Sequence, residues 1–167
     1  MNTFRKMKNY FQRFRKRRFI NKLSKKNIAG LNLKVFGTKL PTILNEDNVY
    51  LGNNVRLNEG VYLFPYGDSK IRIEDNVTLS PFVRIFTGGY DLQVLLNEKK
   101  DEVENNHISG DILIGENCWI GHSTIILPGV KLNGKNIIVG AGSVVTKSFN
   151  KSNVLIAGNP ATIKKVY

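Results

Sequence analysis

The segment Ile114-Gly-Glu-Asn-Cys-Trp-Ile-Gly-His-Ser-Thr-Ile-Ile-Leu-Pro-Gly-Val-Lys-Leu132 carries an aliphatic residue at every sixth position. The same step of six recurs on both sides of it, and the anchors are Leu51, Leu57, Leu63, Ile73, Leu79, Ile85, Ile114, Ile120, Ile126, Leu132, Val139 and Val145. A small or β-branched residue follows most anchors by four positions, as Val55 and Cys118 do. A period of six fits neither an α-helix at about 3.6 residues per turn nor a plain strand at about 2. It predicts short strands and tight turns, with three such units closing one triangular coil around the anchors.

The repeat is interrupted where the spacing between anchors changes. From Leu63 to Ile73 the step is ten, which predicts a bulge over about Phe64 to Lys70. From Ile85 to Ile114 the step is 29, and this polar stretch, with its charged Glu98–Glu104 segment, predicts a long extruding loop over residues 86–111. Long loops of this kind commonly carry functional residues.

The turns of the repeat need residues that tolerate a left-handed backbone. Glycine and asparagine are the residues that adopt it at least cost. We expect Asn53, Asn54, Asn76 and Asn117 to occupy such turn positions.

The charge of the chain is concentrated at its N-terminus. The 167 residues have a formal net charge of +12. Residues 1–28 contain 11 Lys and Arg and no acidic residue, whereas residues 29–167 contain 14 basic and 13 acidic residues, a net of +1. The chain is therefore predicted to be a basic arm, residues 1–28, followed by a nearly neutral domain, residues 29–165. Because that domain offers no second basic groove, nucleic acid is not the expected partner.

The basic arm has the pattern of an amphipathic helix. Phe4, Met7, Phe11 and Phe14 recur at spacings of three and four, which places them on one helical face. Such a helix lies on an anionic membrane surface or packs on its own domain or a neighbouring subunit, and the sequence leaves both open. One cysteine and the lack of an apolar signal segment predict a cytoplasmic protein, peripheral at the inner face of the cell membrane if the arm binds lipid.

Four blocks in the C-terminal third are the most specific part of the sequence. They are Ile114–Gly121, Ile126–Val130, Val139–Lys147 and Ala157–Ala161, in that order. Together with the repeat, over about residues 45–165, they resemble the hexapeptide-repeat acyltransferases, near the galactoside, maltose and nodulation-factor O-acetyltransferases. The resemblance implies an all-β, left-handed parallel β-helix of hexapeptide repeats and a homotrimer with active sites at the subunit interfaces. It also implies acetyl-CoA as donor, a sugar hydroxyl as acceptor, and direct transfer with a histidine general base and an oxyanion held by backbone N–H groups.

The resemblance assigns the binding of the acetyl-CoA donor to residues of these blocks. The residues are Trp119, Gly140, Ala141, Ser143, Thr146, Lys147, Asn159, Pro160 and Lys164. Trp119 would flank the pantetheine arm, and the small residues from Gly140 would let the thioester approach the backbone. Lys147 and Lys164 would meet the phosphates. Three of these residues also have a purely structural explanation. Trp119 could cap a coil, Ser143 could fill an inward position of its repeat, and Lys164 could lie in a solvated tail.

The general base is where this sequence departs from the family. Thr87-Gly-Gly-Tyr-Asp91 stands where the family has Thr-Gly-x-His-Asp, so Tyr90 replaces the expected histidine. A phenol with a pKa near ~10 is a poor base at neutral pH, although Tyr90 could hydrogen-bond an acceptor. The candidates for the base are His107, at the far end of the loop, and His122, after the Trp-Ile-Gly block. Asp91 or Glu116 could orient an imidazole, and Cys118 is predicted to be a core residue and not a nucleophile.

Three other functions are compatible with this repeat. An acetyltransferase acting on xenobiotics such as antibiotics would not need the basic arm. A non-catalytic scaffold would account for Tyr90. A zinc-dependent carbonic anhydrase is disfavoured because it needs three histidine ligands and the chain has two histidines, so no metal site is predicted.

Overall fold

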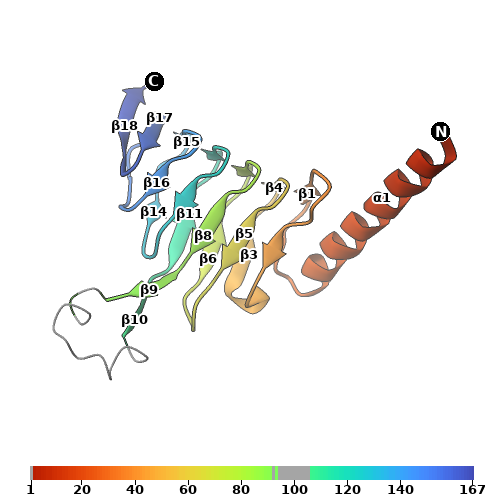
Figure 1. Cartoon of the computed structure of the whole chain (residues 1–167). Helices are drawn as coiled ribbons and strands as arrows, with labels where there is room; N and C mark the ends of the chain where they lie inside the picture. The colour runs from red at the N-terminus through yellow and green to blue at the C-terminus, as the bar shows by residue number, and fades with distance from the viewer. Residues whose placement is uncertain (1, 92, 94–105) are drawn as a thin grey trace.

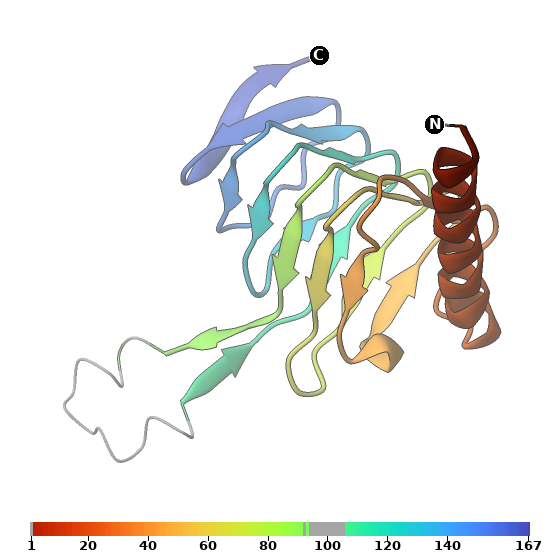
Figure 2. The same ribbon diagram turned by 45° about the vertical axis from the view of Figure 1, so that its right-hand side comes forward.

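Three parallel sheets form the sides of a stack of coils in the computed structural model, which describes residues 2–91, 93 and 106–167 (Figures 1 and 2). Face A contains β3 (Val49–Leu51), β6 (Ile71–Ile73), β11 (Ile112–Ile114) and β14 (Lys131–Leu132). Face B contains β1 (Lys34–Val35), β4 (Arg56–Leu57), β7 (Thr78–Leu79), β12 (Trp119–Ile120), β15 (Ile137–Val139) and β17 (Val154–Gly158). Face C contains β2 (Thr42–Ile43), β5 (Tyr62–Phe64), β8 (Arg84–Phe86), β13 (Ile125–Ile126) and β16 (Val144–Val145). The predicted all-β class and the parallel coil are confirmed.

The predicted anchors form the interior of the stack. All twelve are at most 1% exposed to solvent. The strand register sets Leu57 beside Leu79, and Leu79 beside Ile120, so each anchor lies on the anchor of the next coil. Val55 and Cys118, four positions after an anchor, are buried as well. The core is therefore a continuous column in which each coil buries the anchors of its neighbours.

One corner of the coil is built almost entirely from asparagine. Asn54, Asn76 and Asn117 have positive φ angles of 56°, 60° and 58°, as predicted. The Nδ2 of Asn54 donates to the Oδ1 of Asn76 at 3.1 Å, and Asn32 donates to Asn54 in the same way at 3.2 Å. The amides therefore form a ladder along the stack.

The prediction for Asn53 is wrong. This residue is not among those with a positive φ angle. Its side chain instead accepts the N–H of Leu31 at 2.9 Å and donates to Asp75 Oδ2 at 3.1 Å. Asn53 therefore contributes side-chain hydrogen bonds, whereas Asn54 occupies the left-handed backbone position of the turn.

The two longer interruptions leave the stack at the same corner. We call the corner where the chain passes from face C to face A the C–A corner, and the corner from face B to face C the B–C corner. The predicted bulge lies between β5 and β6, and Phe64 belongs to the strand. The predicted loop contains an antiparallel hairpin of β9 (Gly88–Tyr90) and β10 (His107–Ser109), which projects from the stack (Figure 1). Residues 92 and 94–105, with the Glu98–Glu104 segment, lie outside the described residues.

The N-terminal helix and the C-terminal hairpin lie at opposite ends of the stack (Figure 2). α1 spans Asn2–Lys25, and its Leu23 is fully buried in the core, with the short 3₁₀ helix η1 (Glu46–Asn48) nearby. At the other end β18 (Ala161–Val166) turns back antiparallel on β17. Ile28, the last residue of the predicted arm, is buried, so the arm ends inside the first coil and not before it.

The anchors should dominate the stability of the stack. Ile85 is fully buried and pairs with Leu63 and Ile126 in the neighbouring coils. We expect Ile85→Ala to lower the free energy of unfolding by about 2–5 kcal/mol, because it leaves a cavity in the column. Arg84→Ala, on the exposed side of the same strand, should change it by less than about 0.5 kcal/mol. Urea denaturation followed by circular dichroism measures both, and equal losses would contradict the prediction.

The asparagine ladder makes a second, separable contribution. Asn54→Ala places an ordinary side chain at a φ of 56° and removes two amide hydrogen bonds. We expect a loss of about 1–2 kcal/mol from the backbone alone. Asn54→Gly removes the same hydrogen bonds without the backbone cost and should lose clearly less. If glycine and alanine are equally destabilising in urea denaturation, the left-handed backbone is not the source of the asparagine preference.

Candidate active site

His107 and Tyr90 face each other at the base of the projecting hairpin. β9 and β10 pair antiparallel, and their register places His107 directly opposite Tyr90. The centroids of the two rings are 4.5 Å apart. An imidazole therefore lies beside the position where the resemblance leads us to expect a histidine, although it comes from the other strand of the hairpin.

Tyr66 packs on the same imidazole and was not singled out from the sequence. Its ring centroid lies 4.8 Å from that of His107. Gly88 permits this approach, since a Cβ on Gly88 would lie 2.6 Å from the Tyr66 Cβ. The Tyr66 N–H donates to Oγ1 of the fully buried Thr87 at 2.7 Å, which ties the bulge to the start of the hairpin. Tyr66 could have been found by noting that both register breaks interrupt the repeat between face C and face A.

Asp91 is engaged with the backbone of the hairpin. Its carboxylate accepts the N–H of Gln93 at 2.9 Å, and its own N–H donates to the carbonyl of Asn106 at 3.0 Å. These bonds lie just beyond the Tyr90–His107 pair. Among the described residues no hydrogen bond joins Asp91 to an imidazole. No contact within one chain therefore supports its predicted role of orienting the base.

His122 lies at the B–C corner, away from His107. Its Nδ1 is 2.9 Å from Ser123 Oγ, and its ring packs edge-on against Phe82 with centroids 5.4 Å apart. β8 begins beside this corner and ends at the hairpin, so the two histidines lie at opposite edges of face C. One chain does not bring His107 and His122 together.

Several of the implied donor-binding residues gather around the B–C corner. Ala141 lies next to His122 along the stack, because the Gly142 N–H donates to the His122 carbonyl at 2.8 Å. Gly140 directly precedes Ala141 in the chain. The turn containing Asn159 and Pro160 follows β17, and β17 pairs with β15, so this turn lies at the same corner of the stack. A Cβ on Gly142 would meet nothing within 4 Å, so the backbone at this corner is open.

Ser143 turns its side chain into the stack. It is fully buried, and its hydroxyl donates to the Gly140 carbonyl at 2.7 Å while accepting the Gly158 N–H at 3.1 Å. The hydroxyl is therefore occupied in holding the corner together, and a contact with a donor would come from the backbone of this segment.

The remaining predicted donor residues are exposed, but they do not all lie at this corner. Trp119 projects from face B with 56% of its surface exposed, and its Nε1 donates to Ser80 Oγ at 2.8 Å. Thr146 and Lys147 are exposed after β16, toward the C–A corner, and Lys164 is exposed on β18. The open backbone, the indole and the Lys164 cation are thus exposed on face B or at the B–C corner, whereas Thr146 and Lys147 lie at the opposite edge of face C.

Cys118 is buried, as predicted. Burial raises the pKa of its thiol to about 11, so the thiol stays protonated at neutral pH and is a poor nucleophile. Over the described part of the chain, no three His, Cys, Asp or Glu side chains gather closely enough to hold a metal ion.

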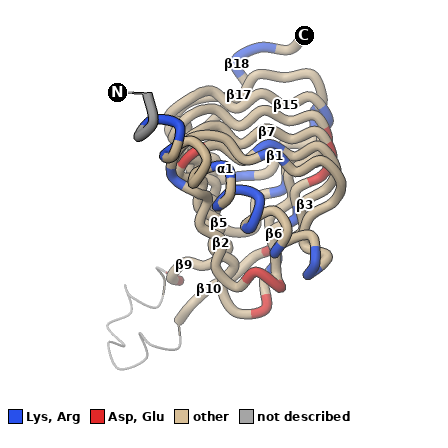
Figure 3. The backbone as a smooth tube through the Cα atoms, turned by 90° about the vertical axis from the view of Figure 1, so that its right-hand side faces the viewer, with Lys and Arg blue, Asp and Glu red and all other residues tan. Residues whose placement is uncertain are grey.

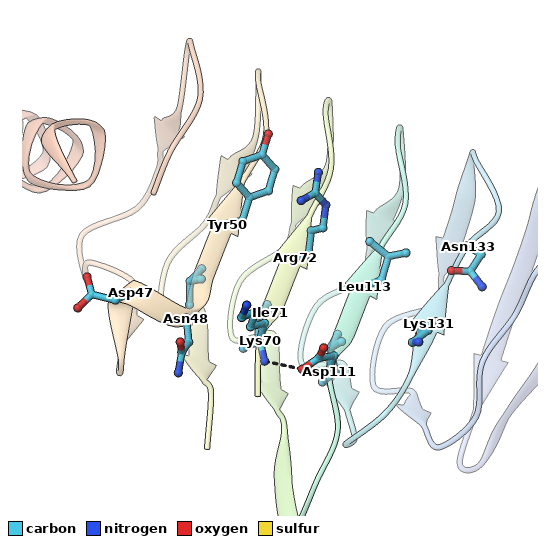
Figure 4. Close-up of a pocket in the computed structure, with 12 residues that line it drawn as sticks. Asp47, Asn48, Tyr50, Lys70, Ile71, Arg72, Asp111, Leu113, Lys131 and Asn133 are labelled. Carbon is cyan, nitrogen blue, oxygen red and sulfur yellow. Dashed lines mark hydrogen bonds between the residues drawn. The ribbon is translucent and has the colours of Figure 1, made fainter. Parts of the chain in front are cut away.

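A groove of about 540 Å³ crosses the outer side of face A (Figure 4). Tyr50, Arg72, Leu113 and Lys131 line it from successive strands. The Arg72 guanidinium lies over the Tyr50 ring, 4.4 Å from its centroid. None of the predicted site residues lines this groove, so it is separate from the candidate active site.

Comparisons with known proteins agree with the repeat. Residues 112–147 match the family model described as the hexapeptide repeat of succinyl-transferase. The chain is 36% identical over 159 residues to a putative acetyltransferase of Dictyostelium discoideum, covering 89% of this chain and 77% of that protein. It is 30% identical over 151 residues to a putative lipopolysaccharide biosynthesis O-acetyl transferase of Escherichia coli (strain K12), covering 75% of each. It spans about half the length of other curated relatives, such as a galactoside O-acetyltransferase of the same strain, 34% identical over 70% of this chain and 53% of the relative.

Solved structures share the fold. A galactoside acetyltransferase in complex with coenzyme A superposes with a TM-score of 0.69 at 30% identity, covering 83% of this chain and 64% of that one. A maltose O-acetyltransferase from Clostridium difficile 630 superposes with a TM-score of 0.70 at 27% identity, covering 92% and 88%. The buried anchors, the parallel coils and these similarities lead to one conclusion: the chain belongs to the hexapeptide-repeat acyltransferase family.

Proposed function

We propose that this protein is an acetyl-CoA-dependent O-acetyltransferase that acts on a sugar hydroxyl during assembly of a surface polysaccharide in the cytoplasm. The observation that carries the proposal is the pairing of His107 with Tyr90, which supplies an imidazole beside the position of the missing family histidine. The relatives support the substrate class, since they include galactoside and maltose O-acetyltransferases and a putative lipopolysaccharide biosynthesis O-acetyl transferase.

His107 is the proposed general base. Its imidazole accepts the proton of the acceptor hydroxyl, which makes the oxygen a competent nucleophile at neutral pH. Tyr66 and Tyr90 flank the ring and restrict its rotation, while His107 itself remains exposed to an incoming acceptor. Tyr90 offers its phenol as a hydrogen-bonding group for the acceptor sugar.

The acceptor oxygen attacks the thioester carbonyl of the acetyl-CoA donor, the C–S bond breaks, and coenzyme A leaves as the thiol with the proton that the base took from the hydroxyl. The B–C corner suits the donor, because the backbone of residues 140–142 is free of large side chains and a Cβ at Gly142 would meet nothing within 4 Å. Trp119 offers an exposed indole for the pantetheine arm, and Lys164 offers a cation for the phosphates. Lys147 is exposed toward the C–A corner, at the other edge of face C.

The two parts of the proposed site require two copies of the chain. His107 lies at the C–A corner and the donor residues near His122 lie at the B–C corner, at opposite edges of face C. A homotrimer in which the C–A corner of one copy meets the B–C corner of the next would bring the base to the donor. We therefore propose a trimer with a shared active site at each interface.

Removal of the base should be visible in kcat. We expect His107→Ala to lower the rate of acetyl transfer by about 10²-fold or more, the range for loss of a general base. His122→Ala is the matched control at the other corner and should have a smaller effect. Release of free coenzyme A measures both. A nearly normal rate for His107→Ala, or a larger loss for His122→Ala, would move the base to another residue.

Subunit complementation tests the shared site. Ala141→Trp should block the donor corner and His107→Ala should remove the base, so each variant alone should be inactive. Co-expression with two different affinity tags yields mixed assemblies in which some interfaces combine an intact corner with an intact His107. We expect partial recovery of activity in these assemblies. No recovery in purified mixed assemblies would place both parts of the site in one copy.

A panel of acceptors tests the function itself. Purified full chain and acetyl-CoA would be offered free sugars, nucleotide sugars and antibiotics, with product detection by mass spectrometry. We expect a mass gain of one acetyl group on a sugar. Acetylation of an antibiotic but of no sugar would favour the xenobiotic alternative. Failure to bind acetyl-CoA at millimolar concentration would favour the non-catalytic scaffold.

A further inference from the structure

The N-terminal helix α1 exposes a row of large apolar side chains. Met7, Tyr10, Phe11 and Phe14 are 66%, 74%, 61% and 53% exposed. Their spacing of three and four places them on one side of the helix, and we call them the apolar stripe. The side chain of Phe4, which the sequence places in the same row, lies outside the described residues. Four contiguous large apolar groups in solvent indicate a binding surface.

The helix packs on the domain with a different side. Leu23 is fully buried, and Phe19 and Ile20 pack against the core around it. At about 100° of rotation per residue, the side formed by these three residues points roughly opposite to the apolar stripe. The stripe therefore faces away from the domain. Turning it inward would pull Leu23 out of the core.

Ion pairs hold the helix in this orientation. Lys22 Nζ is 2.6 Å from Glu46 Oε1, and Lys26 Nζ is 3.2 Å from Asp47 Oδ1. Both pairs join the end of the arm to η1, on the domain. Burial of Leu23 and these pairs together fix which side of α1 is presented to solvent.

Cations border the stripe on both edges. The same rotation sets Arg13 and Arg17 along one edge and Lys8 and Arg15 along the other. The Arg15 guanidinium lies 6.0 Å from the centroid of the Phe11 ring. Figure 3 shows the Lys and Arg residues gathered along α1, and residues 1–28 contain no acidic residue at all.

We propose that α1 lies on an anionic membrane surface, with the apolar stripe in the headgroup boundary and the bordering cations on the lipid phosphates. A second copy is a poorer occupant, because pairing two arms through the stripe would bring together two segments that each carry 11 basic and no acidic residues. No described helix is both long enough and apolar enough to cross a bilayer. The binding surface does not include the candidate active site, so membrane binding and acetyl transfer can fail independently.

Vesicle co-sedimentation of the full chain tests this surface. We expect binding to phosphatidylcholine vesicles that contain phosphatidylglycerol and little binding to phosphatidylcholine alone. The triple variant Met7→Ser, Phe11→Ser, Phe14→Ser should bind at least about tenfold more weakly, because three side chains lose their apolar contact. Arg13→Gln and Arg17→Gln should each weaken binding about fivefold, and high salt should weaken binding of the unaltered chain.

Two control variants separate the stripe from a general loss of structure. Met7→Leu, Phe11→Leu, Phe14→Leu keeps an apolar stripe and should keep binding. Leu31→Ser, Phe36→Ser, Leu44→Ser removes exposed apolar groups from the domain and should also keep binding. Undiminished binding by the stripe serine variant would overturn the proposal, as would no binding of the unaltered chain to anionic vesicles. A change in oligomer mass by analytical ultracentrifugation, with vesicle binding unaltered, would assign the stripe to a second copy instead.

Discussion

The stacking of aliphatic anchors between successive coils is the interaction on which the rest of the structure depends. Leu57, Leu79 and Ile120 lie one on another along face B, and the parallel strand pairing that aligns them also satisfies the backbone of each coil. A coil of this kind cannot bury its anchors alone, so the stack needs a cover at each end. Leu23 of α1 covers the first coil, and β18 folds back on the last.

A stack with a closely packed interior leaves its corners to carry function. Inward positions are taken by aliphatic residues, and even Ser143 and Cys118 serve the interior of the stack. The corners tolerate insertions and unusual side chains because they lie outside the packed column of anchors. The hairpin that carries His107 leaves one corner, and the open backbone beside His122 forms another. In the proposed enzyme, the stack therefore carries two partial sites at different corners, and a complete site forms only where two copies of the chain meet.

The period of six was sufficient to predict the coil, the buried anchors and the places in the sequence where the bulge and the long loop interrupt the repeat. Each of these follows from side-chain alternation and turn chemistry, which are local properties of the sequence. The difference between Asn53 and Asn54 was not predictable in this way, because both are asparagine in the same turn and only the backbone decides which adopts a positive φ. Tyr66 was missed for a related reason, since its partner His107 is distant in sequence.

The sequence by itself determined the fold class, the inward and outward positions of the repeat and the separation of a basic arm from a neutral domain. Only the tertiary structure decided that His107 lies opposite Tyr90, because hairpin register depends on pairing across a long insertion. Only the tertiary structure decided that the apolar stripe of α1 faces solvent, because burial of Leu23 selects the other side of the helix. Local patterns specify which face of an element is apolar, and long-range packing selects what that face meets.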